Sequence, residues 1–117
     1  MSSIMELSLD AERYSEPVLF VSGRIDAAAA QILREECAAH RSAGHQRLIV
    51  SLADVSFVSS SGLGSFLVIS EEFKATGGNV VFAAPVRSVS HVLKLLNLDQ
   101  FLDIAPDLPA ALGLVPA

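Results

Sequence analysis

Three consecutive serines, Ser59, Ser60 and Ser61, stand between an apolar run and a segment with helical spacing of apolar residues. A hydroxyl at the start of a helix can accept a hydrogen bond from an amide of the first turn, which has no partner within the helix. A serine there can also carry a phosphoryl group, whose charge the helix N-terminus favours by roughly 0.3–1 kcal/mol. Capping needs only one or two of the hydroxyls, so the cluster predicts either a purely structural helix start or a modifiable surface.

Two glycines, Gly62 and Gly64, follow the serines directly. Without side chains, they are expected to leave the first helical turn open to the close approach of a partner. A phosphoserine beside them would add about two negative charges and a bulky group to that surface. The pattern therefore predicts a protein interface that phosphorylation can switch off.

A serine hydrolase is the first competing interpretation of the cluster. The nucleophile elbow of such enzymes has the form GxSxG, but the position two before Ser61 is Ser59 rather than glycine. His40, His45 and His91 fall in different predicted segments, and their spacing nominates no triad. We expect the chain not to be an enzyme.

Nucleotide binding is the second competing interpretation. Gly62-Leu63-Gly64 resembles the start of a dinucleotide fingerprint, but Leu67 occupies the position of the third glycine. The lysine of a Walker A loop is also missing. We therefore expect no cofactor.

Length and composition predict one folded domain over residues 1–117. The chain is 51% hydrophobic and 18% charged, far from the composition of disordered proteins. The mean hydropathy of +0.49 is high. It indicates buried strands and alanine-rich helices, and some of the apolar residues can belong to a partner-binding surface. We expect a monomer or a weak dimer.

Charge and cysteine content limit the classes of partner. The net charge is -5 and the 8 basic residues are scattered, which argues against direct nucleic-acid binding. A single cysteine, Cys37, excludes an internal disulfide and fits a buried position in a reducing cytosol. The start of the chain lacks signal-peptide features, and no segment approaches the roughly 20 apolar residues of a membrane span. We expect a cytoplasmic protein with no membrane insertion.

Hydrophobic periodicity and turn-forming residues divide the chain into strands and helices. In the first helix an apolar stripe is expected at Ala29, Ile32, Leu33 and Cys37. The predicted strands are Ile4 to Leu9, Pro17 to Val21, Arg47 to Leu52, Asn79 to Ala83 and Phe101 to Ile104. The predicted helices begin after Asp26, near Leu63, at Pro85 and at Asp107, and the first three end at Gly44, Gly77 and Asn97.

The order β-β-α-β-α-β-α-β-α predicts an α/β fold. Its core is a mixed four- to five-stranded sheet with helices packed mainly on one face, because parallel neighbours need crossover helices. The serine cluster then follows the carboxyl end of a central strand, where open α/β sheets place their functional crevice.

The segment LIVSLADVSFVSSSGLGSFLVI resembles the signature of the STAS domain in bacterial anti-sigma factor antagonists, also called anti-anti-sigma factors. That signature has an apolar strand, an aspartate, two more residues and an aromatic residue, and then DSSGLG. GRID at Gly23 to Asp26 resembles the GELD of the family, and LLNLDQFLDI resembles its last helix-to-strand passage. The resemblance runs from about Ile4 to Leu112.

The resemblance implies that Ser61, immediately before the motif glycine, is phosphorylated by an anti-sigma factor that is also a serine kinase. The unphosphorylated antagonist binds the anti-sigma factor and frees a sigma factor, and a serine phosphatase reverses the modification. Asp26 is the acidic residue of the neighbouring loop; a helix N-cap role explains it fully and is favoured over direct partner contact, although the two roles can coexist. The implied partner-binding residues are Asp26, Asp54, Ser59, Ser60, Ser61, Gly62, Leu63 and Gly64.

One position departs from the family pattern, because Ser59 stands where the signature usually has aspartate. If that carboxylate orients the hydroxyl or engages the kinase, its loss slows phosphorylation or changes the partner. The alternative interpretation is a STAS subunit that is never phosphorylated and docks on the ATPase of a membrane transport complex. A third interpretation, a small-ligand carrier or a hydrolase on the same fold, has no motif to support it.

Overall fold

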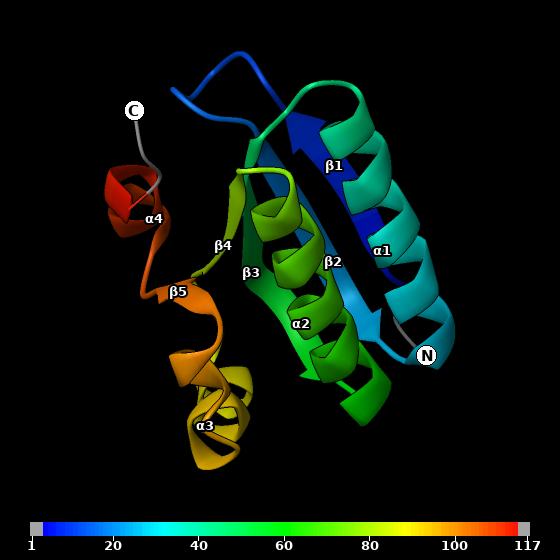
Figure 1. Ribbon diagram of the computed structural model, residues 1–117. Coiled ribbons are helices and arrows are strands. Elements are labelled where there is room, and N and C mark those ends of the chain that lie inside the picture. Colours follow the sequence, from blue (N-terminus) through cyan, green and yellow to red (C-terminus); the bar gives the residue numbers. More distant parts are fainter. Residues whose placement is uncertain (1–3, 115–117) are drawn as a thin grey trace.

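The computed structural model describes residues 4–114, which form a five-stranded sheet with strands in sequence order (Figure 1). The first strand is antiparallel to the second, and all other neighbours are parallel. The expectation of a single domain over residues 1–117 stays a prediction, and residues 1–3 and 115–117 lie outside the described part. The strands are β1 Glu6–Asp10, β2 Val18–Ile25, β3 Arg47–Val58, β4 Asn79–Ala83 and β5 Asp103–Ala105.

The helices divide between two faces and one end of the sheet. Figure 1 shows α1 and α2 side by side over one face and α4 on the opposite side, while α3 lies near the end of β3. The predicted α/β fold with a mixed sheet and helices mainly on one face is confirmed. The helices are α1 Ala27–Ser42, α2 Ser60–Ala75, α3 Arg87–Leu95 and α4 Leu108–Leu114, with a 3-10 turn at Leu98–Gln100.

The main core fills the space between the sheet and the pair α1 and α2. Phe66 of α2 stacks on Phe82 of β4 with ring centroids 4.5 Å apart, and the buried Cys37 of α1 belongs to the same cluster. A smaller cluster on the other face packs under α4. Both faces of the central strands are therefore covered, which agrees with their continuous apolar runs.

Two strands run further than the sequence predicted. β3 continues past Leu52 to Val58, since Val55 again points into the core. Gly23 does not end β2, which continues to Ile25. Gly23 has a φ of +94°, and a Cβ there would collide with the Ile4 carbonyl, so glycine is needed inside the strand.

Two smaller predictions also need correction. Ile32 does not belong to the buried stripe of α1, because its side chain is 53% exposed. The last strand begins at Asp103 rather than at Phe101, which follows the 3-10 turn and is exposed. Asn97 has a φ of 58°, which confirms the predicted left-handed residue after α3.

Candidate functional site

The junction between β3 and α2 is tied to the junction between β2 and α1. The amide of Ser59 donates a 2.8 Å hydrogen bond to the carbonyl of Ile25, the last residue of β2. The next residue, Asp26, starts α1. The two loops that the sequence analysis singled out are therefore neighbours at the carboxyl edge of the sheet.

Ser59 caps α2. Its backbone is extended, with φ -75° and ψ 171°, and its hydroxyl accepts a 3.1 Å hydrogen bond from the amide of Gly62. The first intrahelical bond runs from Leu63 N to the Ser59 carbonyl at 2.9 Å. Aspartate caps helices about as well as serine. The departure from the STAS signature at this position therefore keeps the helix start intact.

The other two serines lie in the first turn of α2 and are exposed. Neither the Ser60 nor the Ser61 hydroxyl has a hydrogen-bond partner in the part of the chain that the structure describes. One serine of the cluster is thus used for capping, and two hydroxyls face solvent.

The two glycines of the motif have different environments. A Cβ on Gly62 would lie 2.6 Å from Val58 Cγ1 and 3.0 Å from Ile25 Cγ2, so this residue lets α2 pack against the strand ends. A Cβ on Gly64 would meet nothing within 4 Å. Gly62 and the neighbouring Leu63 are buried. Of the two glycines, Gly64 is therefore the more accessible to a partner.

A groove with a volume of about 260 Å³ runs between α1 and α2, and we call it the polar groove because Gln31, Arg34, Ser61 and Ser65 are among its lining residues. Ser61 lies on its α2 wall, and Arg34 lies on its α1 wall, where its Nε is buried without a hydrogen-bond partner. The hydroxyl of Ser65 donates a 2.6 Å hydrogen bond to the Gly62 carbonyl and secures the first turn. The groove is lined by Ala27, Ala30, Gln31, Arg34, Ser61, Gly64, Ser65 and Val68.

The two aspartates of the predicted site lie at different distances from the serines. Asp26 caps α1 through a 2.9 Å hydrogen bond from the Ala29 amide, and it sits next to the hydrogen-bonded loops. Asp54 lies within β3, opposite Ser22 of β2. At about 3.3 Å per residue, it is about 13 Å along the strand from Val58. The structure brings Asp26 to the serine loop but leaves Asp54 apart from it.

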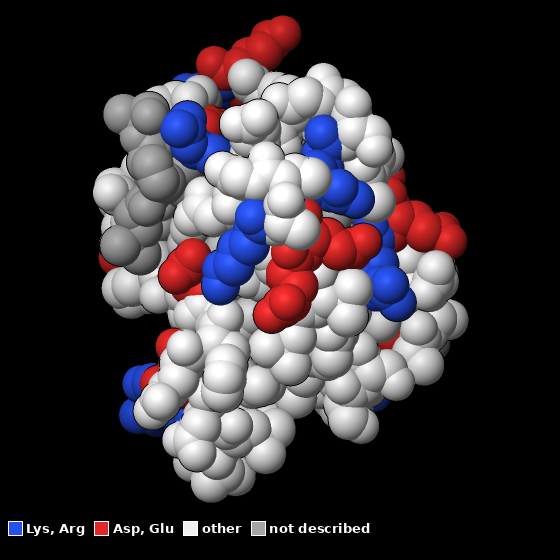
Figure 2. Space-filling model, in the orientation of Figure 1, with Lys and Arg blue, Asp and Glu red and all other residues white. Residues whose placement is uncertain are grey.

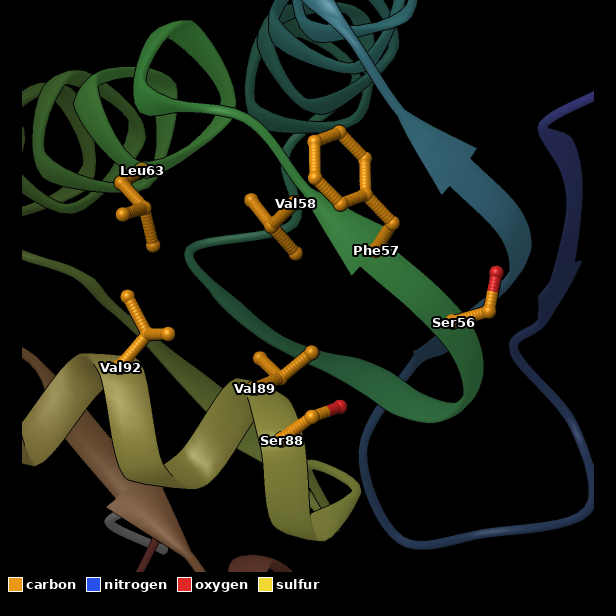
Figure 3. Close-up of a pocket in the computed structure, with 7 residues that line it drawn as sticks. All are labelled: Ser56, Phe57, Val58, Leu63, Ser88, Val89 and Val92. Atoms are coloured by element: carbon orange, nitrogen blue, oxygen red, sulfur yellow. The ribbon is translucent and has the colours of Figure 1, made fainter.

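An apolar pocket of about 160 Å³ lies on the other side of the first turn of α2 (Figure 3). In Figure 3, Leu63 of α2 and Val92 of α3 point toward each other across it. Arg24 does not itself line this pocket, but its guanidinium carbon lies 4.2 Å from the centre of the ring of the lining residue Phe57, a cation–π contact. The lining residues are Ser56, Phe57, Val58, Leu63, Ser88, Val89 and Val92.

His40 and Cys37 lie in the C-terminal half of α1, away from the serine loop. His40 and His45 contact each other near the C-terminal end of α1, and His40 is about 15 Å along the helix from Ala30. Burial raises the pKa of the Cys37 thiol to about 12, with a smaller contribution from Glu36 and Glu72. Within residues 4–114, no group of three metal-ligating side chains comes together, and no helix is long and apolar enough to cross a membrane.

The STAS domain family model matches residues 8–111. The chain belongs to the STAS domain family. The match spans β2 to β5, α1, α2, α3 and parts of β1 and α4, and it includes the serine loop, the polar groove and the apolar pocket. The fold and the family that the sequence motif suggested are thus confirmed.

Several solved structures share this STAS fold. An anti-sigma factor antagonist from Mycobacterium paratuberculosis is 23% identical, with a TM-score of 0.85 over 98% of each chain. Bacillus SpoIIAA in its phosphorylated form is 22% identical, with a TM-score of 0.65 over 86% of this chain and 91% of that one. The murine anion transporter Slc26a9 is 14% identical, with a TM-score of 0.64 over 95% of this chain and 22% of the transporter.

Most residues that line the polar groove and the apolar pocket were not predicted from the sequence. Arg34 lies seven residues after Ala27, which places both residues on the same face of the helix, two turns apart. This spacing could have indicated that Arg34 lines the polar groove. Phe57 and Val92 come from elements far apart in the sequence. No local pattern indicated that they share a pocket.

Proposed function

We propose that this STAS protein is an anti-sigma factor antagonist controlled by phosphorylation of Ser61. In its unphosphorylated form it binds an anti-sigma factor with serine kinase activity and thereby frees a sigma factor. Transfer of the γ-phosphoryl group of ATP to the Ser61 hydroxyl, with loss of its proton, ends the complex. A serine phosphatase hydrolyses the phosphoserine and restores binding. The chain is the substrate in both steps, which take place in the cytoplasm.

The observation that carries the proposal is that the three serines have different structural roles. Ser59 caps α2, while the Ser61 hydroxyl is exposed and has no partner within the described residues. A kinase can therefore reach Ser61 without breaking a hydrogen bond of the domain. The amides of the first turn and the positive end of the helix dipole then stabilise the added charge.

The polar groove supports the proposed loss of partner binding on phosphorylation. A phosphate on Ser61 would lie on the groove that also contains the Arg34 side chain, so the fold can accept the charge. A partner that covers the groove would instead have to remove water from a dianion, which is costly without a paired cation. Phosphorylation is thus expected to remove the docking surface while leaving the domain folded.

The proposed interface comprises the exposed part of the predicted site, with Ser59, Gly62 and Leu63 shaping the turn from beneath. Asp54 can belong to it only if the partner also covers the middle of β3. The exposed members are Asp26, Asp54, Ser60 and Ser61, together with the half-buried Gly64.

The experiment uses the anti-sigma factors with kinase domains encoded in the same genome as this protein. Each is incubated with the protein and radiolabelled ATP, and binding is measured for wild type, Ser61→Ala and Ser61→Asp. We expect label in wild type and in the control variant Ser60→Ala but not in Ser61→Ala. Ser61→Asp is expected to bind at least tenfold more weakly and to keep the thermal midpoint of wild type. Label that persists in Ser61→Ala, or equal affinity of all variants, contradicts the proposal.

A second candidate is a STAS subunit that is never phosphorylated and docks on the ATPase of a membrane transport complex. Ser59 in place of the usual aspartate is compatible with this candidate. A STAS-like fold also forms part of the Slc26a9 transporter. The same experiment separates the two functions. The absence of label with every kinase, together with tight binding of Ser61→Asp to a transporter ATPase, would favour this candidate.

A further inference from the structure

The apolar pocket beside the serine loop is open at the surface rather than sealed in the core. Phe57 is 38% exposed and Val92 is 36% exposed, although both are large apolar side chains. Leu95, the last residue of α3, follows Val92 at i+3 on the same side of the helix, and both Leu95 and the C-cap residue Leu96 are also exposed. Figure 2 shows that the end of the molecule that carries α3 is mostly uncharged, whereas charged side chains gather over the middle.

The size of the pocket limits what can fill it. Its volume of about 160 Å³ is close to that of the cavity of about 150 Å³ that binds one benzene molecule in an engineered protein. Pockets for cofactors and drug-sized ligands are larger, about 300–1,000 Å³. One aromatic ring or one large aliphatic side chain therefore fits, and a nucleotide does not.

The position of the pocket makes it continuous with the proposed interface. Leu63 lines the pocket, and Ser61, two residues earlier, lines the polar groove on the other side of the same turn. A protein segment that covers Ser60 and Ser61 therefore reaches both. Binding energy at protein interfaces is concentrated in such central apolar anchors.

The charge at the edge of the pocket indicates what surrounds the anchor. Arg24 stacks on Phe57 and forms no ion pair with a carboxylate of residues 4–114. Arg87 precedes Ser88, a lining residue, and likewise forms no ion pair within those residues. An acidic partner segment would complement both cations.

From these observations we infer that the pocket receives one large apolar side chain of the anti-sigma factor, carried on a segment with carboxylates that pair with Arg24. This inference rests on the proposed function and deepens it. The anchor supplies affinity, and Ser61 controls whether it can enter. A phosphate within one helical turn of Leu63 would have to be desolvated when the anchor docks, so phosphorylation opposes the contact.

The test measures the dissociation constant of the unphosphorylated protein with the anti-sigma factor identified in the labelling experiment. Val92→Phe fills the pocket from within and keeps the surface apolar, while Val92→Gln makes the pocket wall polar. Phe101→Gln is the matched control, because Phe101 is 64% exposed and lies near Lys74, at the far end of α2 from Ser61. Arg24→Glu tests the charge of the partner segment.

We expect both Val92 variants and Arg24→Glu to weaken binding at least tenfold, and Phe101→Gln to change it less than twofold. Circular dichroism and thermal midpoints check the fold, and Val92→Gln carries the test if Val92→Phe does not fold. If the folded Val92 variants bind with wild-type affinity, the inference is wrong but the proposed function stands. The same holds if Phe101→Gln loses as much affinity as the Val92 variants. If wild type binds no anti-sigma factor, both fail.

Discussion

Ser61 and Arg34 face the same groove from neighbouring helices, one at the first turn of α2 and the other two turns into α1. Arg34 forms no ion pair with any carboxylate of residues 4–114, and its Nε has no hydrogen-bond partner there. A cation without a counter-ion thus accompanies the hydroxyl that we propose as the phosphoacceptor. The effect of this cation on a phosphate at Ser61 can be measured on the phosphorylated protein itself.

Arg34 is expected to lower the second pKa of phosphoserine 61, which lies near 6 in the absence of neighbours. Removing the charge by Arg34→Gln should raise this pKa by up to about 1 unit, because the groove is partly open to water. Arg34→Lys, which keeps the charge, is the control. The measurement is a phosphorus NMR titration. The same pKa in wild type and Arg34→Gln would show that the guanidinium does not reach the phosphate.

Loss of the cap on α2 should destabilise the domain. Ser59→Ala removes the acceptor for the Gly62 amide and is expected to lower the free energy of unfolding by about 1 kcal/mol. Ser59→Asp restores the acceptor and should stay close to wild type. Ser60→Ala is the control, expected within about 0.5 kcal/mol of wild type. Urea unfolding measures all three variants, and equal losses in Ser59→Ala and Ser60→Ala would contradict the assignment.

Alanine at the two motif glycines should have opposite effects on stability. Gly62→Ala places a methyl group 2.6 Å from Val58 Cγ1 and should cost about 1–3 kcal/mol. Gly64→Ala meets no neighbour and should stabilise the helix by about 0.5–1 kcal/mol. Thermal and urea unfolding of the pair provide the measurement. A stabilised Gly62→Ala would mean that the helix start can shift away from the strand ends.

The buried Cys37 thiol should make stability fall with rising pH. Its pKa is raised to about 12 in the folded domain from an ordinary value of 9.0. Above about pH 9 the unfolded chain therefore loses this proton while the folded chain keeps it, and unfolding becomes easier. Cys37→Ala should show a shallower decline in the free energy of unfolding from pH 8 to pH 10. Parallel declines in the two proteins would argue against a protonated buried thiol.

Local rules predicted the elements that position the site. Asp26 was expected to cap α1 and does so, and the strand Asn79–Ala83 has the bounds that its apolar run indicated. Asn97 adopts the expected left-handed conformation. In each case the deciding interaction lies within a few residues in the sequence.

The features that the sequence did not reveal depend on contacts between distant elements. Gly62 was expected to open the surface, but its environment is set by Ile25 and Val58, which pack against it from two strand ends. Ile32 is exposed although it fits the apolar stripe, because the burial of a helix face depends on where its neighbours lie. The polar groove likewise exists only because α1 and α2 pack side by side.

The sequential strand order of the sheet bears on how the protein folds. Each strand pairs only with the strands next to it in the chain, separated by one turn or by a connection that carries an α-helix, which between β4 and β5 is followed by the 3-10 turn. Every strand after β1 therefore adds to the edge that the strand before it provides. During synthesis, each newly emerged strand therefore already has its pairing edge in place on the preceding part of the chain.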